Sequence, residues 1–91
     1  MAQAKWRDLL DEHLYDIAIE LQPVIDDVCM KLKSNLTAYE YAGIGSTTNK
    51  MKKVEKLVNS VRSRDLAVFN KFCEVLEACG HKTLARKLRG I

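Results

Sequence analysis

The apolar residues of this chain recur at steps of three and four, the spacing at which one face of an α-helix is buried. Six such stretches follow one another, and none alternates apolar and polar residues as a half-buried strand does. The pattern therefore predicts an all-α chain. The first helix should span residues 3–21, with an inward stripe made of Trp6, Leu10, Leu14, Ile17 and Leu21.

Two large apolar residues of this first helix, Tyr15 and Ile19, fall outside the stripe. Either both side chains are exposed, or the helix bends near Asp16 and presents a second face to the core. Pro23 then interrupts the pattern. It suits the first turn of a new helix, because proline lacks the backbone N–H that a helix interior needs.

The second predicted helix spans residues 23–34, and its inward positions are Ile25, Val28, Cys29 and Leu32. Thr37 and Glu40 have the spacing of a capping box, in which each residue's side chain accepts a hydrogen bond from the other's backbone N–H. This pair predicts a short third helix that ends at the glycines of residues 43–45.

The fourth predicted helix follows the N-cap candidates of residues 46–49 and ends near Ser63. Its inward positions are Met51, Val54, Leu57, Val58 and Val61. Asp65 can cap a fifth helix, and Gly80 can end it. The inward positions of that helix are Leu66, Phe69, Phe72, Cys73 and Leu76. The last helix, over residues 82–89, turns inward Leu84, Ala85 and Leu88.

Short connections between amphipathic helices predict a six-helix antiparallel bundle that forms one domain over residues 1–91. A chain of 91 residues can bury one modest core and has little material for a deep active-site cleft. Because the last predicted helix reaches almost to the final residue, we expect the domain to be part of a larger protein.

The cellular setting follows from what the sequence lacks. No apolar run approaches the roughly 18 residues of a membrane span, and the first eight residues lack the apolar stretch of a signal peptide. The cysteines are odd in number and form no CxxC pair, which is typical of reduced thiols in or near a core: Cys29, Cys73 and Cys79. We expect a cytoplasmic protein without a membrane partner.

The two halves of the chain carry opposite charge. Residues 1–45 hold eight acidic and four basic side chains, whereas residues 46–91 hold eleven basic and four acidic ones. A molecule with two oppositely charged regions can attract a copy of itself, or a relative, head to tail.

The order of several short segments resembles one family. These segments are LQP at 21–23, LTAYEY at 36–41, TTNKM at 47–51, LVNSVRSR at 57–64, FNKFCEVL at 69–76 and GHKTLARKL at 80–88. Together they resemble the caspase recruitment domain, or CARD, a branch of the death-fold superfamily, over essentially the whole chain. Many CARDs carry Arg-Gly between the fourth and fifth helices, where this chain has Arg64 followed by Asp65.

The resemblance implies a Greek-key bundle with a bent first helix. It also implies homotypic binding to other CARD-containing proteins, as a homo-oligomer, a filament or a heterotypic complex, in apoptosis or in innate immunity such as inflammasome assembly. No cofactor and no small-molecule substrate are expected of such a module.

In CARDs, an acidic surface on the second and third helices commonly meets a basic surface on the first and fourth. The residues that match the acidic side by type and helix position are Asp26, Asp27 and Glu40. Those that match the basic side are Arg7, Lys52, Lys53 and Lys56. The outer face of the first helix is mixed, because acidic residues surround Arg7 there: Asp8, Asp11, Glu12 and Asp16.

Other classes of protein fit less well. His13 lies three residues before Asp16, but a surface pair explains that spacing better than a catalytic dyad, and we predict no enzyme activity. The histidines and cysteines form no zinc pattern. A nucleic-acid-binding domain is the main alternative, with the lysines of residues 50–56 on a recognition helix, although the acidic first half argues against it. An adaptor bundle that binds one foreign helix in a groove is the third class.

A second basic cluster lies at the end of the chain. It consists of Lys82, Arg86, Lys87 and Arg89. The cluster can form a further assembly surface, complement the dipole of the last helix, or serve solubility near a linker, and the sequence leaves these alternatives open.

Overall fold

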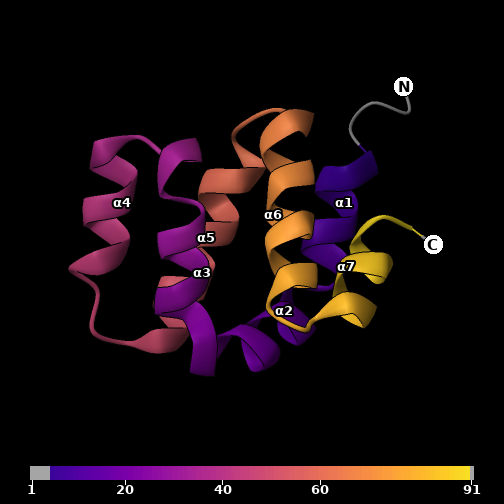
Figure 1. Ribbon diagram of the computed structural model, residues 1–91, viewed down its shortest axis with the longest axis horizontal. Helices are drawn as coiled ribbons and strands as arrows, with labels where there is room; N and C mark the ends of the chain where they lie inside the picture. The colour runs from indigo at the N-terminus through magenta and orange to yellow at the C-terminus, as the bar shows by residue number, and fades with distance from the viewer. Residues whose placement is uncertain (1–4, 91) are drawn as a thin grey trace.

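The computed structural model describes residues 5–90 and contains seven α-helices joined by short connections (Figure 1). Their bounds are α1 Lys5–Glu12, α2 Leu14–Leu21, α3 Ile25–Lys31, α4 Ala38–Gly45, α5 Lys50–Arg62, α6 Leu66–Ala78 and α7 Lys82–Leu88. Two 3-10 turns, η2 Gln22–Val24 and η3 Lys33–Asn35, flank α3. Within residues 5–90 there is no strand, so the predicted all-α class is confirmed.

The predicted first helix is present as α1 and α2, which a non-helical residue separates. His13 has φ −101° and ψ 15°, away from the α-helical values of its neighbours. With α1 and α2 counted as one bent helix, the described chain forms the six-helix bundle that was predicted. The bend lies three residues before Asp16, and the predicted start of the helix at residue 3 lies outside the described residues.

The bend does not bury the two apolar residues that fell outside the stripe. Tyr15 is 71% exposed and Ile19 is 50% exposed. Of the two explanations offered for them, exposure is therefore confirmed.

The second predicted helix was too long at both ends. Pro23 lies inside the 3-10 turn η2, and only Ile25–Lys31 is α-helical. Val24 has φ −121° and ψ 14°, so the chain turns once more after the proline before α3 begins. At the other end, Leu32 leaves the helical region and the chain tightens into η3.

The predicted caps are confirmed. The N–H of Thr37 donates to Glu40 Oε1 at 2.9 Å, and the N–H of Glu40 donates to Thr37 Oγ1 at 3.0 Å, which completes the capping box of α4. Asn49 caps α5 through the N–H of Lys52 at 3.0 Å, and Asp65 caps α6. Each cap contributes about 1 kcal/mol to the stability of its helix. Gly80, with φ +90°, ends α6 in a conformation that favours glycine.

All seven helices contribute to one core. Its largest fully buried side chains include Phe72, Leu10, Ile17, Leu57, Leu84 and Leu88. Two predicted core residues, Met51 and Leu66, are exposed instead. Both lie in the first turn of a helix.

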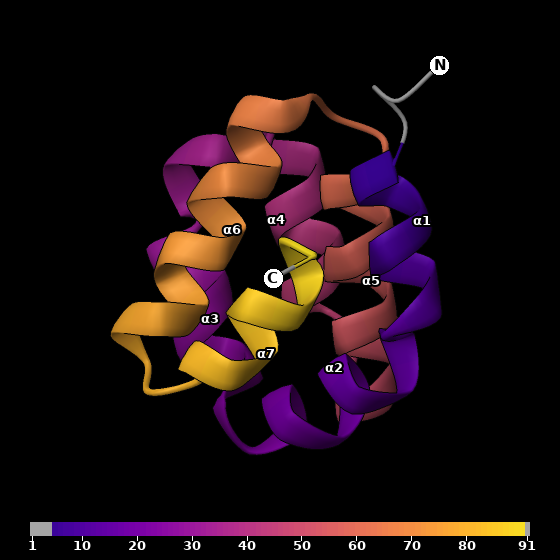
Figure 2. The same cartoon turned by 90° about the vertical axis from the view of Figure 1, so that its right-hand side faces the viewer.

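The arrangement of the helices places distinct surfaces at the two ends of the molecule. The bundle measures 35 × 23 × 20 Å, with α4 at one end of the long axis and α1 and α7 at the other (Figure 1). Figure 2 shows α3 and α6 on one side of the bundle and α1 and α5 on the opposite side.

Candidate protein-interaction surfaces

The acidic residues predicted on α3 are exposed but already paired. Lys53 Nζ donates to Asp26 Oδ1 at 2.7 Å, and Lys31 Nζ donates to Asp27 Oδ2 at the same distance. These hydrogen bonds hold the pKa of both carboxyl groups below the ordinary value. Asp26 is 69% exposed at its side chain, so water still reaches its other oxygen. Both carboxylates are therefore charged and accessible at neutral pH.

Glu40, the acidic residue predicted on α4, has a structural task. Burial opposes its ionisation, but hydrogen bonds from the N–H of Thr37 and from the Arg64 guanidinium outweigh burial and lower its pKa. Arg64 lies just after α5, so this ion pair fixes the first turn of α4 against the end of α5.

The three predicted acidic residues do not form one surface. Asp26 contacts Lys53, near the beginning of α5, whereas Glu40 contacts Arg64, just past its end. From Lys53 to the last residue of α5, Arg62, the helix rises over nine residues, or about 14 Å at 1.5 Å per residue. Asp26 and Asp27 remain together in the first turn of α3, and Glu40 belongs to a different region.

The lysines of α5 divide in the same way. Lys53 is turned toward α3, and its side chain is only 14% exposed. Lys56 donates to Thr47 Oγ1 at 2.7 Å and remains exposed. Lys52 is exposed and has no carboxylate within ion-pair distance among residues 5–90. Lys52 is therefore unpaired on the outer face of α5, and Lys56 is exposed beside α4 with a hydrogen bond to Thr47.

The side chain of Arg7, predicted on the basic surface, makes its contacts within the fold. Its Nε donates to the carbonyl of Arg62 at 2.8 Å, and its Nη2 donates to the carbonyl of Arg64 at 2.7 Å. Its guanidinium also lies over the Trp6 ring, 4.3 Å from the centroid. These contacts satisfy carbonyls at the C-terminal end of α5, which have no partner inside the helix. The sequence carries no signal for them, because the partners are 55 and 57 residues away.

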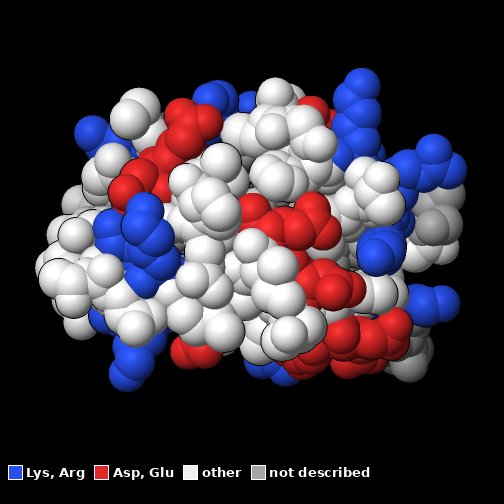
Figure 3. Space-filling view, turned by 90° about the horizontal axis from the view of Figure 1, so that it is seen from below, with Lys and Arg blue, Asp and Glu red and all other residues white. Residues whose placement is uncertain are grey.

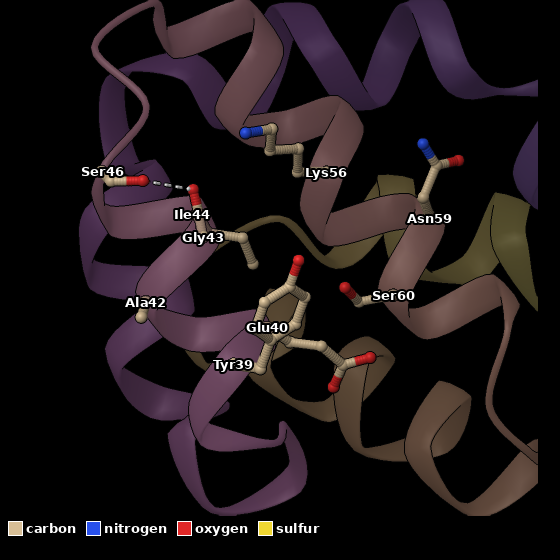
Figure 4. Close-up of a pocket in the computed structure, with 9 residues that line it drawn as sticks. All are labelled: Tyr39, Glu40, Ala42, Gly43, Ile44, Ser46, Lys56, Asn59 and Ser60. Carbon is tan, nitrogen blue, oxygen red and sulfur yellow. Dashed lines mark hydrogen bonds between the residues drawn. The ribbon is translucent and has the colours of Figure 1, made fainter.

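A pocket of about 520 Å³ opens between α4 and α5 (Figure 4). From α5 its lining includes Lys56, Asn59 and Ser60, and from α4 it includes Glu40 and Gly43. The pocket brings one predicted acidic residue and one predicted basic residue to the same groove, rather than to opposite surfaces. At its edge the Ser46 hydroxyl donates to the Gly43 carbonyl at 3.1 Å.

Two further observations bear on the class of protein. In the described chain, His, Cys, Asp and Glu side chains form no group of three that could hold a metal ion. None of the helices over residues 5–90 combines the length and the apolar character that a membrane crossing requires.

A family comparison identifies the class of this helical bundle. The family model for the caspase recruitment domain matches residues 7–90. The chain therefore belongs to the CARD family. No curated protein and no solved structure gave a match. CARDs bind other CARD-containing proteins in apoptotic and inflammatory signalling, and their fold is an interaction module rather than an enzyme fold. The Arg64–Asp65 sequence that departs from the family pattern keeps its turn, because Asp65 caps α6.

Proposed function

We propose that this domain assembles head to tail with CARD partners, which are either further copies of itself or the CARDs of other proteins. The contact joins the carboxylates in the first turn of α3, Asp26 and Asp27, to the exposed lysines of α5, Lys52 and Lys56. Lys53 takes part through its pair with Asp26, whereas Glu40 and Arg7 support the fold around the contact.

One observation carries this proposal. Asp26 and Asp27 lie on α3, Lys52 and Lys56 lie on the neighbouring helix α5, and both sets of side chains reach solvent. Each copy then offers two different and complementary surfaces, and a contact between different surfaces propagates from copy to copy instead of closing. The result is a filament or an open oligomer that grows by repetition of one contact.

Protein is a better partner than nucleic acid for the lysines of α5. Lys53 is paired with Asp26, and Lys50 also lies close enough to that carboxylate to lower its pKa. A phosphate backbone would meet this acidic group among the lysines, whereas an acidic protein surface can pair with Lys52 and Lys56 alone. The three free cysteines support a reducing setting such as the cytoplasm.

Light scattering and negative-stain electron microscopy over a range of salt concentrations test the proposal. We expect filaments or large oligomers at low salt that shrink as salt rises, because screening weakens exposed charge pairs. The variant Lys52→Glu/Lys56→Glu should remain monomeric. The control Lys33→Glu/Lys71→Glu changes charge equally at exposed lysines outside α5 and should assemble like the parent. A parent that stays monomeric at every salt concentration would contradict self-assembly and leave only heterotypic partners.

A further inference from the structure

A second pocket, of about 390 Å³, opens where the beginnings of α1 and α6 meet the end of α7. Figure 2 looks onto this part of the molecule and shows the end of α7 between α1 and α6. The apolar side chains that line the pocket are Trp6, Leu9, Leu66, Phe69 and Leu88. Leu66, which the sequence predicted in the core, is 52% exposed. The bundle therefore leaves an apolar pocket open to solvent here.

The charged side chains that line this pocket are both basic. Lys5 is exposed, and among residues 5–90 no carboxylate lies within ion-pair distance of it. The side chain of Arg89 is 32% exposed, and its Nη1 lies 3.5 Å from Glu77 Oε2. Asn70 adds a side-chain amide to the lining. The pocket therefore suits apolar groups that are accompanied by negative charge.

Helix α2 has the complementary properties. Tyr15 and Ile19 are 71% and 50% exposed, and residues four apart on a helix share a face. The charged residues of α2 are both acidic: Asp16 and Glu20, with side chains 44% and 38% exposed. Figure 3 shows acidic side chains gathered on the underside of the bundle, where α2 lies. An exposed apolar pair thus occurs on a helix whose only charges are negative.

The other large apolar side chains that are exposed within residues 5–90 match the pocket less well. Met30 is followed by Lys31, and Met51 lies between two lysines, so a basic pocket would repel the charges beside them. Tyr39 is followed by Glu40, but that carboxylate is paired with Arg64. Leu66 belongs to the pocket itself. The two apolar residues of α2 are therefore the best match on this chain.

We propose that the pocket binds α2 of a second copy of the chain. The two exposed apolar side chains of α2 fill the pocket, and the carboxylates of α2 lie near its basic residues. Asn70 offers a hydrogen-bond partner for the Tyr15 hydroxyl, which such a group needs when it is buried. Charge complementarity selects a second copy, because the pocket and α2 carry opposite charge. The contact covers apolar surface that each copy exposes when it is alone.

This contact is independent of the head-to-tail assembly proposed above. It joins two different surfaces, the pocket of one copy and α2 of another, and is therefore heterologous. The pocket residues come from α1, α6 and the end of α7, whereas the head-to-tail contact uses α3 and α5. The two proposals can therefore fail separately.

Sedimentation velocity over a series of protein concentrations tests the contact. All proteins carry Lys52→Glu/Lys56→Glu, which keeps head-to-tail assembly from masking the result. In this background the chain with native pocket and native α2 should associate as its concentration rises, and less strongly as salt rises. A monomer at every concentration and at low salt would overturn the proposal.

Two double variants remove one side of the contact each. Tyr15→Gln/Ile19→Gln removes the apolar pair of α2, and Lys5→Gln/Leu66→Gln alters the pocket. Each should associate at least roughly tenfold more weakly, about 1.4 kcal/mol. All four side chains are exposed, so the fold should persist, as checked by circular dichroism. If a double variant does not fold, Ile19→Gln or Leu66→Gln alone takes its place.

A matched control removes two exposed apolar residues elsewhere. Met30→Gln/Tyr39→Gln should associate like the background chain, because neither residue belongs to α2 or to the pocket. Equal weakening by this control would overturn the proposal and show that association depends on exposed apolar surface in general.

A mixture of the α2 variant and the pocket variant gives the sharpest test. Each is defective on one side only, so the intact pocket of one can still bind the intact α2 of the other. The mixture should form a one-to-one complex, although each variant alone stays monomeric at the same concentration. Trp6, the single tryptophan of the chain, lines the pocket, so the emission of the mixture should differ from the sum of its parts. A mixture that does not associate would overturn the proposal.

Discussion

The α5 region and the α1–α7 end of this domain use charge differently. Around α5, the charged groups mostly join elements of the same chain: Lys53 pairs with Asp26, Arg64 pairs with Glu40, and Arg7 binds the carbonyls after α5. At the α1–α7 end, Asp8, Lys82 and Arg86 are exposed and have no ion-pair partner within residues 5–90. The comparison teaches that sequence position and charge alone do not mark an interaction surface. Each charged group has to be judged by its exposure and by the contacts that it already makes within the fold.

The largest expected effect distinguishes Arg7 from Lys52, two residues that the sequence placed in one basic surface. Arg7→Ala removes two charge-assisted hydrogen bonds and the contact with Trp6, so it should lower the free energy of unfolding by about 2 kcal/mol. Lys52→Ala should change it by less than about 0.5 kcal/mol. Urea denaturation followed by circular dichroism measures both. Equal effects of the two substitutions would show that Arg7 does not support the end of α5.

A smaller effect is expected for the ion pair between Glu40 and Arg64, and it should depend on pH. The folded state lowers the pKa of Glu40 from its ordinary value of 4.5. The stability that this carboxylate contributes is therefore fully present above pH 4.5 and is lost as pH falls through the lower folded pKa.

The substitution Glu40→Gln measures this contribution. The difference in melting temperature between the parent and Glu40→Gln should be largest near neutral pH and should shrink as the pH falls below that ordinary value. Glu55→Gln is a suitable control, because Glu55 is exposed and has no ion-pair partner within residues 5–90. A difference for Glu40→Gln that does not change with pH would argue against a charged Glu40 in the ion pair.

The smallest effect concerns Asp26, whose side chain is mostly exposed although that of its partner Lys53 is not. An ion pair with an exposed carboxylate contributes little to stability, so Asp26→Asn should leave the melting temperature almost unchanged. Its effect on assembly should be larger, because the same carboxylate is a proposed contact between copies. A variant that loses stability but assembles normally would reverse this assignment and make Asp26 a purely structural residue.

Local signals in the sequence predicted much of the fold. Thr37 with Glu40, Asn49, Asp65 and Gly80 act on backbone groups a few residues away, and their caps and turns formed as expected. The wrong predictions concern the burial of side chains, which depends on the neighbouring helices. Met51 and Leu66 fit the inward stripes of their helices, but both lie in a first turn and are exposed.

The candidate surfaces were harder to predict than the helices. The pairs of Lys53 with Asp26 and of Arg64 with Glu40 join residues 27 and 24 positions apart, and the contacts of Arg7 span more than twice that distance along the chain. No periodicity within one helix reveals such partners. The sequence identified charged residues and the helices that carry them, and the fold then divided these residues into paired and unpaired groups.

Complementary charge reversal tests the central proposal, head-to-tail assembly through α3 and α5, most directly. Lys52→Glu/Lys56→Glu and Asp26→Lys/Asp27→Lys should each fail to form large assemblies when alone, as measured by light scattering. When the two variants are mixed, each retains one intact surface and has one reversed surface. The two reversed surfaces are again complementary, so paired complexes should return and should weaken with salt. If both variants assemble like the parent, the contact between α3 and α5 is wrong.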